Sequence, residues 1–147
     1  MYQRILVATD GSELSNKAVQ SATELAALTG ATLFALKVVP PYPRSYMEGA
    51  LPVDPTSLKE IEAQWTDTAQ ALVDSIKTTA AAQGVTVEAL VTKSDLVAEA
   101  VIAAAKKYEC DLIVMASHGL KGIKRLLLGS ETQHVLTHSH IPVLVLR

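Results

Sequence analysis

The sequence lacks most features of secreted, membrane-spanning and nucleic-acid-binding proteins. Cys110 is the only cysteine, so no disulfide can form within the chain, and a reducing compartment is expected. No apolar run is long enough to span a bilayer, and the run at residues 5–8 is too short for a secretory signal. The net charge of -2 gives no reason to expect nucleic acid or an anionic membrane as a partner. We therefore expect a cytoplasmic protein with no membrane insertion and no nucleic-acid binding.

Common signatures of nucleotide-dependent and hydrolytic enzymes are also absent. The chain has no Gly-x-x-x-x-Gly-Lys-Ser/Thr loop and no Gly-x-Ser-x-Gly nucleophile elbow. Asp10-Gly11-Ser12 follows the first apolar run, where a dinucleotide-binding fold would carry Gly-x-Gly-x-x-Gly. No nucleophile, base and orienting group form an evident set, and no carboxylate cluster suggests a divalent-metal hydrolase. The sequence therefore predicts no catalytic residue.

Short apolar runs alternate with segments of helical periodicity along the 147 residues. Strands are expected at residues 4–9, 31–39, 85–91, 112–115 and 143–146, and helices at residues 13–28, 56–83 and 94–107, with a short helix opening at Gly129-Ser130. Pro40, Pro41 and Pro43 place a loop over residues 40–55. This alternation predicts a single-domain α/β protein, a three-layer sandwich in which about four helices cover both faces of a five-stranded, mostly parallel sheet.

Helix ends and buried helix faces can also be assigned. Ser12 can cap the first helix, and Gly30 and Gly84 can end the first and second. Ser94 or Asp95 is expected to cap the third helix. Inward-facing side chains are expected at Leu58, Ile61, Trp65, Leu72, Ile76 and Ala80 on the second helix, at Leu96, Val97, Ala100, Val101 and Ala104 on the third, and at Val135 and Leu136 on the fourth.

A sheet of this kind binds ligands beyond the carboxyl ends of its strands, where the strand order reverses. This rule selects residues 9–12, 38–41 and 116–119. The last quarter of the chain then offers a layout suited to phosphate, because Gly119, Gly122 and Gly129 let the main chain approach an anion closely.

Polar and basic residues support this phosphate layout. Ser130 can cap the following helix and present a hydroxyl, and the dipole of that helix favours an anion by roughly 0.3–1 kcal/mol. Lys121, Lys124 and Arg125 add positive charge. The alternative is that the glycines only form turns and the cations a solvated surface, and spacing alone leaves both interpretations open.

The whole chain resembles the universal stress protein family. The ATP-binding, glycine-motif branch of that family carries Gly-x-x-Gly, nine residues, and then Gly-Ser or Gly-Thr; here Gly119 is the second glycine, residues 120–128 are the nine, and Gly129-Ser130 closes the motif. The strand ends Val7-Ala8-Thr9-Asp10 and Lys37-Val38-Val39 and the terminal Pro142-Val143-Leu144-Val145-Leu146 also match. The resemblance implies one universal stress protein domain over residues 1–147, with a Rossmann-like, adenine nucleotide alpha hydrolase-like sheet of order 3-2-1-4-5.

The resemblance further implies an adenine nucleotide, ATP or else AMP or ADP, with or without Mg²⁺. Ala8, Thr9 and Asp10 would lie against the adenosine, where the Asp10 carboxylate could accept hydrogen bonds from ribose or adenine. Val38 would contact adenine and Met115 would pack beneath the nucleotide. The phosphates would meet His118, Gly119, Gly122, Arg125, Gly129, Ser130 and the backbone of Glu131 and Thr132. The alternatives are a helix-capping role for Asp10 and core positions for Val38 and Met115.

Two residues depart from what the resemblance implies. Ala116 replaces the first glycine of the motif. A negative φ there would tolerate the added methyl, whereas a positive φ, or a ligand that touches the α-carbon, would cost on the order of 1 kcal/mol or more. Glu131 stands beside the expected phosphates, which its charge would repel unless the side chain points to solvent or shares a metal ion with them.

The fourth helix also carries a histidine pair. Glu131, His134 and His138 can share one helical face, which could hold zinc. We interpret this face as solvated and predict no metal-ligating residue.

Three functions are compatible with the sequence. The first is a dimeric, ATP-binding regulatory protein of the stress response, and the second is a partner-binding or structural module without nucleotide affinity. The third is a slow ATPase or self-phosphorylating protein with Ser117, Ser130 or Thr132 as the acceptor. The strongly apolar strand Val143–Leu146 is expected at the sheet edge, where the family pairs it with its copy in a homodimer.

Overall fold

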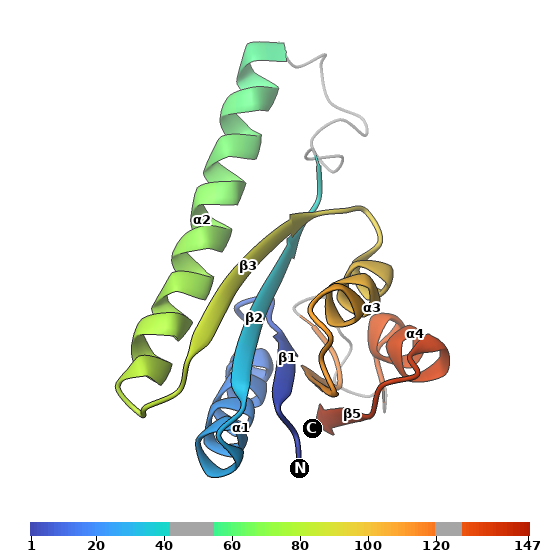
Figure 1. Cartoon of the computed structure of the whole chain (residues 1–147). Coiled ribbons are helices and arrows are strands. Elements are labelled where there is room, and N and C mark those ends of the chain that lie inside the picture. The colour runs from blue at the N-terminus through green and yellow to red at the C-terminus, as the bar shows by residue number, and fades with distance from the viewer. Residues whose placement is uncertain (42–54, 120–127) are drawn as a thin grey trace.

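The computed structural model describes residues 1–41, 55–119 and 128–147. Its strands are β1 (Arg4–Ala8), β2 (Thr32–Val39), β3 (Val87–Lys93), β4 (Leu112–Ala116) and β5 (Val143–Leu146), and its helices are α1 (Glu13–Thr29), α2 (Pro55–Ala81), α3 (Val97–Lys107) and α4 (Ser130–His138). The strands pair in parallel in the order β3-β2-β1-β4-β5 (Figure 1). The predicted α/β class and strand order are confirmed.

Helices cover both faces of the sheet. Figure 1 shows α1 and α2 on one side of the strands and α3 and α4 on the other. In β1, Ile5 and Val7 join the core layer beneath α1 and α2, whereas Leu6 joins the layer beneath α3 and α4. None of these three side chains has exposed surface. Burial on both faces explains why the strands are continuous apolar runs instead of alternating ones.

The ends of α1 are formed as the sequence predicts. Ser15 N–H donates to Ser12 Oγ at 3.2 Å, which satisfies one of the unpaired amides of the first turn. Gly30 has φ 74°, and its N–H donates to Ala26 O at 2.9 Å. This left-handed conformation favours glycine and ends the helix there.

Helix α2 is buried along only part of its length. Its buried residues are Ala69, Val73, Ile76 and Ala80. The expected inward positions Leu58, Ile61 and Trp65 are only partly buried. Figure 1 shows the reason, since the first turns of α2 extend past the end of β3 and have no strand beneath them.

Three apolar residues on the other face of the sheet are not buried as expected. Leu96 is 57% exposed, Val97 37% and Leu136 41%. The buried side of α3 consists of Ala98, Ala100, Val101, Ala104 and Ala105. The inward face of α3 is therefore made mainly of alanines, and the prediction is wrong for these three larger side chains.

The predicted cap of α3 is also wrong. Leu96 occupies the N-cap position and makes no capping bond through its side chain. The Ser94 hydroxyl instead accepts from Leu96 N–H at 3.0 Å and forms a local turn before the helix. Neither Ser94 nor Asp95 occupies the cap position, because α3 begins at Val97 and not directly after these two polar residues.

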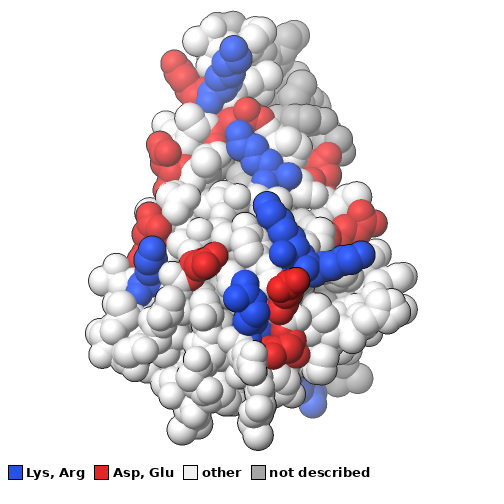
Figure 2. All heavy atoms as spheres, viewed as in Figure 1, with Lys and Arg blue, Asp and Glu red and all other residues white. Residues whose placement is uncertain are grey.

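Charges on the visible surface are mixed. Figure 2 shows acidic and basic side chains interspersed on the face seen in Figure 1. On the described residues of that face, no single sign of charge dominates, so it supplies little long-range attraction for a charged partner. No helix in the described ranges combines the length and apolar character needed to cross a membrane.

The single cysteine lies directly before β4. Cys110 is 5% exposed, and its N–H donates to Ala105 O at 2.8 Å. Burial raises the pKa of the Cys110 thiol to about 11, and the positive charge of Arg4 opposes this rise only in part. The thiolate is the nucleophilic form of cysteine, so the native thiol should be unreactive near neutral pH.

We predict that a thiol reagent at about pH 8 labels Cys110 slowly in the native protein and rapidly in denaturant. Mass spectrometry of samples quenched over time measures both rates. The denatured sample serves as the control for reagent activity. Rapid, complete labelling of the native protein would contradict the burial of this thiol.

Candidate functional site

Two of the three predicted crevice segments, residues 9–12 and 116–119, meet where β1 and β4 end. The two strands pair in parallel through Val7 and Val114, so their carboxyl ends lie at the same edge of the sheet. A side chain built on Gly119 would place its Cβ 2.6 Å from Asp10 Oδ2. Gly119 and Asp10 are therefore in close contact, although 109 positions separate them in the sequence. Only glycine fits here without displacing the carboxylate.

The turn after β1 is held by its own polar groups. Ser12 N–H donates to Asp10 Oδ1 at 2.9 Å, which is an Asx turn. Thr9 Oγ1 lies 3.2 Å from Ser15 Oγ and accepts from Gly11 N–H at 3.3 Å. Thr9 is 5% exposed, so its hydroxyl serves the turn. Asp10 consequently presents Oδ2 toward Gly119 while Oδ1 stabilises the chain reversal.

Ala116 does not occupy a strained position. It is the last residue of β4 and pairs with Leu146 of β5. Among the described residues, Glu109 is the only non-glycine residue with positive φ. The backbone conformation of Ala116 therefore tolerates a methyl group. Alanine at the first position of the motif causes no backbone strain.

Gly129 joins the two ends of the motif. Its N–H donates to Ser117 O at 2.7 Å, and a Cβ built on it would lie 3.3 Å from His118 Cα. The two ends of the motif are therefore in contact, because Gly129 lies against Ser117 and His118. The predicted ligand residues Gly122 and Arg125, with Lys121 and Lys124, lie outside the described residues.

The first turn of α4 has a different cap from the predicted one, and the Thr132 hydroxyl is bonded within the protein. Gly129 is the N-cap, and Ser130 is the first helical residue, so the prediction that Ser130 caps the helix is wrong. Thr132 is 2% exposed and donates its hydroxyl to Ala116 O at 2.9 Å. Of the candidate phosphate acceptors, Ser117 and Thr132 are buried, whereas Ser130 is exposed.

Glu131 is exposed to solvent, which was one of its two expected surroundings, and its carboxylate also has a protein partner. Its Oε2 accepts from Ala98 N–H at 2.8 Å, in the first turn of α3. The carboxylate thus supplies the capping interaction that the Leu96 side chain cannot make. The sequence did not predict that Glu131 contacts Ala98. The one hint was the apolar Leu96 at the start of α3, since its side chain cannot cap the helix.

The remaining predicted contacts lie mainly in the core. Val38 and Met115 are 8% and 7% exposed and belong to the layer beneath α3 and α4, with Ala8 packed against it. His118 is partly exposed, and its Nδ1 lies 3.2 Å from Ser117 Oγ. The polar part of the candidate site therefore consists of Asp10, Gly119, Gly129 and the start of α4.

The sequence and the fold of this chain both match those of known proteins. A profile described as the universal stress protein family matches residues 1–147, the full sequence. The chain belongs to the universal stress protein family.

Similar proteins match this chain along nearly its whole length. Universal stress protein YxiE of Bacillus subtilis is 32% identical over 149 residues, covering 100% of both chains. The solved structure of MJ0577 from Methanocaldococcus jannaschii is 28% identical with a TM-score of 0.80, covering 99% of this chain and 96% of that one. A universal stress protein solved in complex with cAMP is 25% identical with a TM-score of 0.69, covering 99% and 97%.

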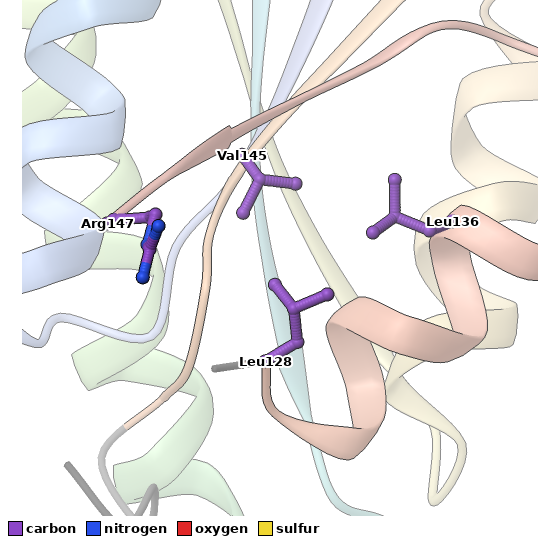
Figure 3. A pocket seen from close by; sticks show the side chains of 4 residues that line it. All are labelled: Leu128, Leu136, Val145 and Arg147. Atoms are coloured by element: carbon purple, nitrogen blue, oxygen red, sulfur yellow. The ribbon is translucent and has the colours of Figure 1, made fainter. Parts of the chain in front are cut away.

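An apolar hollow adjoins the terminal strand of this universal stress protein. Leu128, Leu136, Val145 and Arg147 line it, and Figure 3 shows the three apolar side chains converging from β5, α4 and the residue before Gly129. Leu144 of the same strand is 41% exposed. The edge strand therefore presents apolar surface to solvent in this chain.

The histidines of α4 make contact with each other. The rings of His134 and His138 are 4.2 Å apart, and His138 Nδ1 lies 3.0 Å from His134 O. In the part of the chain that the structure describes, no group of three or more histidine, cysteine or acidic side chains could hold a metal ion.

We predict that Thr132→Val lowers the free energy of unfolding by about 1–2 kcal/mol, since it removes a buried donor to Ala116 O. The matched control is Thr137→Val, because Thr137 donates to Gln133 O on the exposed side of the same helix. Denaturant unfolding measures both, and the control should change stability by less than about 0.5 kcal/mol. Equal losses in the two variants would contradict a special role for the Thr132 bond.

Proposed function

We propose that this universal stress protein is a nucleotide-responsive regulatory module that binds ATP where β1 and β4 end. The contact between Gly119 and the Asp10 carboxylate carries the proposal, because it joins the two halves of the predicted crevice. Adenine nucleotide is also supported by the similar protein in complex with cAMP. A cytoplasmic location suits the single, buried cysteine.

Asp10 would accept hydrogen bonds from the ribose hydroxyls or from adenine. Its Oδ1 is already oriented by Ser12 N–H, so the carboxylate is held in place before a nucleotide arrives. Ala8 and Thr9 directly precede Asp10 at the end of β1, where they would border the adenosine. The buried Val38 and Met115 would contribute the apolar floor of the crevice.

The phosphates would lie against the start of α4. The first amides of a helix have no intrahelical acceptor, so Ser130, Glu131 and Thr132 can direct N–H groups to an anion. The Gly129 N–H would not contact the phosphates, because it donates to Ser117 O. Gly129 instead holds the start of α4 against the end of β4. Gly119 and His118 would border the phosphates from the β4 side, and Mg²⁺ bound with ATP would offset phosphate charge.

We expect the wild-type protein to bind ATP in a calorimetric titration with Mg²⁺ present. Gly119→Ala should weaken binding about tenfold, because the added Cβ must displace the Asp10 carboxylate. Ala116→Gly is the matched control, since it restores the glycine of the family motif and should bind at least as tightly. Absence of ATP binding to the wild type at about millimolar nucleotide would favour a partner-binding module without nucleotide affinity.

We also propose a homodimer formed through Val143–Leu146. Among the described residues, β5 pairs only with β4 and is the last strand of the sheet, so its other edge can pair with a second copy. The exposed Leu144 and the apolar hollow beside Val145 would be covered in such a two-fold contact.

Sedimentation velocity at micromolar concentration should show about twice the 15.7 kDa mass of the chain. Leu144→Glu should shift the protein to monomer, because it would bury a charge at the interface. Leu28→Glu is the control, since Leu28 is 86% exposed at the end of α1 and should leave the mass unchanged. A wild type that sediments only as a monomer would rule out the dimer.

A further inference from the structure

Helix α4 depends on the rest of the molecule for its position. It has nine residues, and an isolated helix of this length has little stability in water. Only Thr132 and Val135 are buried. The placement of its first turn, which carries the phosphate-facing amides of the proposed site, is therefore set by contacts with other elements.

Two hydrogen bonds hold this turn to the end of β4. Gly129 N–H donates to Ser117 O at 2.7 Å, and Thr132 Oγ1 donates to Ala116 O at 2.9 Å. Both acceptors belong to one short stretch of backbone. These bonds therefore restrain α4 from one side only.

Glu131 adds a contact to a different element. Its Oε2 accepts from the amide of Ala98, the second residue of α3, at 2.8 Å. The residue at the N-cap of α3, Leu96, makes no side-chain capping bond. A carboxylate at this point satisfies an amide of the first turn and meets the positive end of the helix dipole. Figure 1 shows α3 and α4 side by side on the same face of the sheet.

We propose that Glu131 is a positioning residue of the nucleotide site, which holds the first turn of α4 between the end of β4 and the start of α3. The part that concerns nucleotide rests on the proposed function. The carboxylate charge is directed to the positive end of α3, which explains how an acidic residue is accommodated beside the expected phosphates.

The test compares Glu131→Gln with Glu131→Ala. Both variants remove the charge, but the glutamine amide oxygen can still accept from Ala98 N–H, whereas alanine cannot. The difference between them therefore reports the hydrogen bond without a change in net charge. Glu99→Gln and Glu99→Ala form the matched control pair, because Glu99 is an exposed acidic residue in the first turn of α3, next to Ala98.

Amide hydrogen exchange measured by NMR tests the positioning without nucleotide. Gln133 N–H donates to Gly129 O at 3.0 Å, which is the first hydrogen bond of α4. The amides of Ala98 and Gln133 should exchange about tenfold faster in Glu131→Ala than in Glu131→Gln. The Glu99 pair should show no such difference at Gln133. Equal exchange of Gln133 in the two Glu131 variants would overturn the proposal.

Calorimetric titration with ATP and Mg²⁺ tests the consequence for the site. Glu131→Ala should bind ATP about threefold or more weakly than Glu131→Gln, although both lack the charge. Equal affinities combined with different exchange rates would show that Glu131 only stabilises the helix, which overturns its role in the site. If the wild type binds no ATP, the proposed function fails, while the exchange comparison still decides whether Glu131 positions α4.

Discussion

The buried central strand β1 is the constraint on which the rest of the structure depends. Ile5, Leu6 and Val7 have no exposed surface, so each face of the sheet needs its own layer of helices. β2 pairs on one side of β1 and β4 on the other, which makes β1 the point where the strand order reverses. The chain leaves β1 toward α1 on one face and leaves β4 toward α4 on the other. A crevice between these two exits follows from this topology.

Most side-chain hydroxyls at this crevice stabilise the protein itself. Those of Thr9 and Thr132 are buried and engaged with neighbouring groups, and Ser117 Oγ lies against His118. The same crevice contains the Asp10 carboxylate, whose Oδ1 accepts from Ser12 N–H, the close backbone approach at Gly119, and the positive end of α4. Of these features, the positive end of α4 is the one suited to an anion, whereas the Asp10 carboxylate would repel an anion and is suited to accepting hydrogen bonds.

Periodicity predicted the elements well because local apolar patterns reflect which face is buried. β1, α1 and β2 all lie within a residue or two of their expected bounds. The errors arise where neighbours decide burial. Leu96 and Leu136 have the spacing of core residues but project from the ends or outer sides of short helices. Along α2, the helical pattern continues beyond the strands that could cover it.

The sequence by itself determined the alternation of strands and helices, the motif ending in Gly129-Ser130, and the family, since these depend on local order along the chain. It also placed Asp10 and Gly119 at strand ends. Only the tertiary structure decided that these two residues touch, that Ala116 lies in unstrained strand geometry, and that the exposed Glu131 also accepts a hydrogen bond from the first turn of α3. Such contacts join residues far apart in the chain, and their geometry depends on how the layers pack, which no local pattern records.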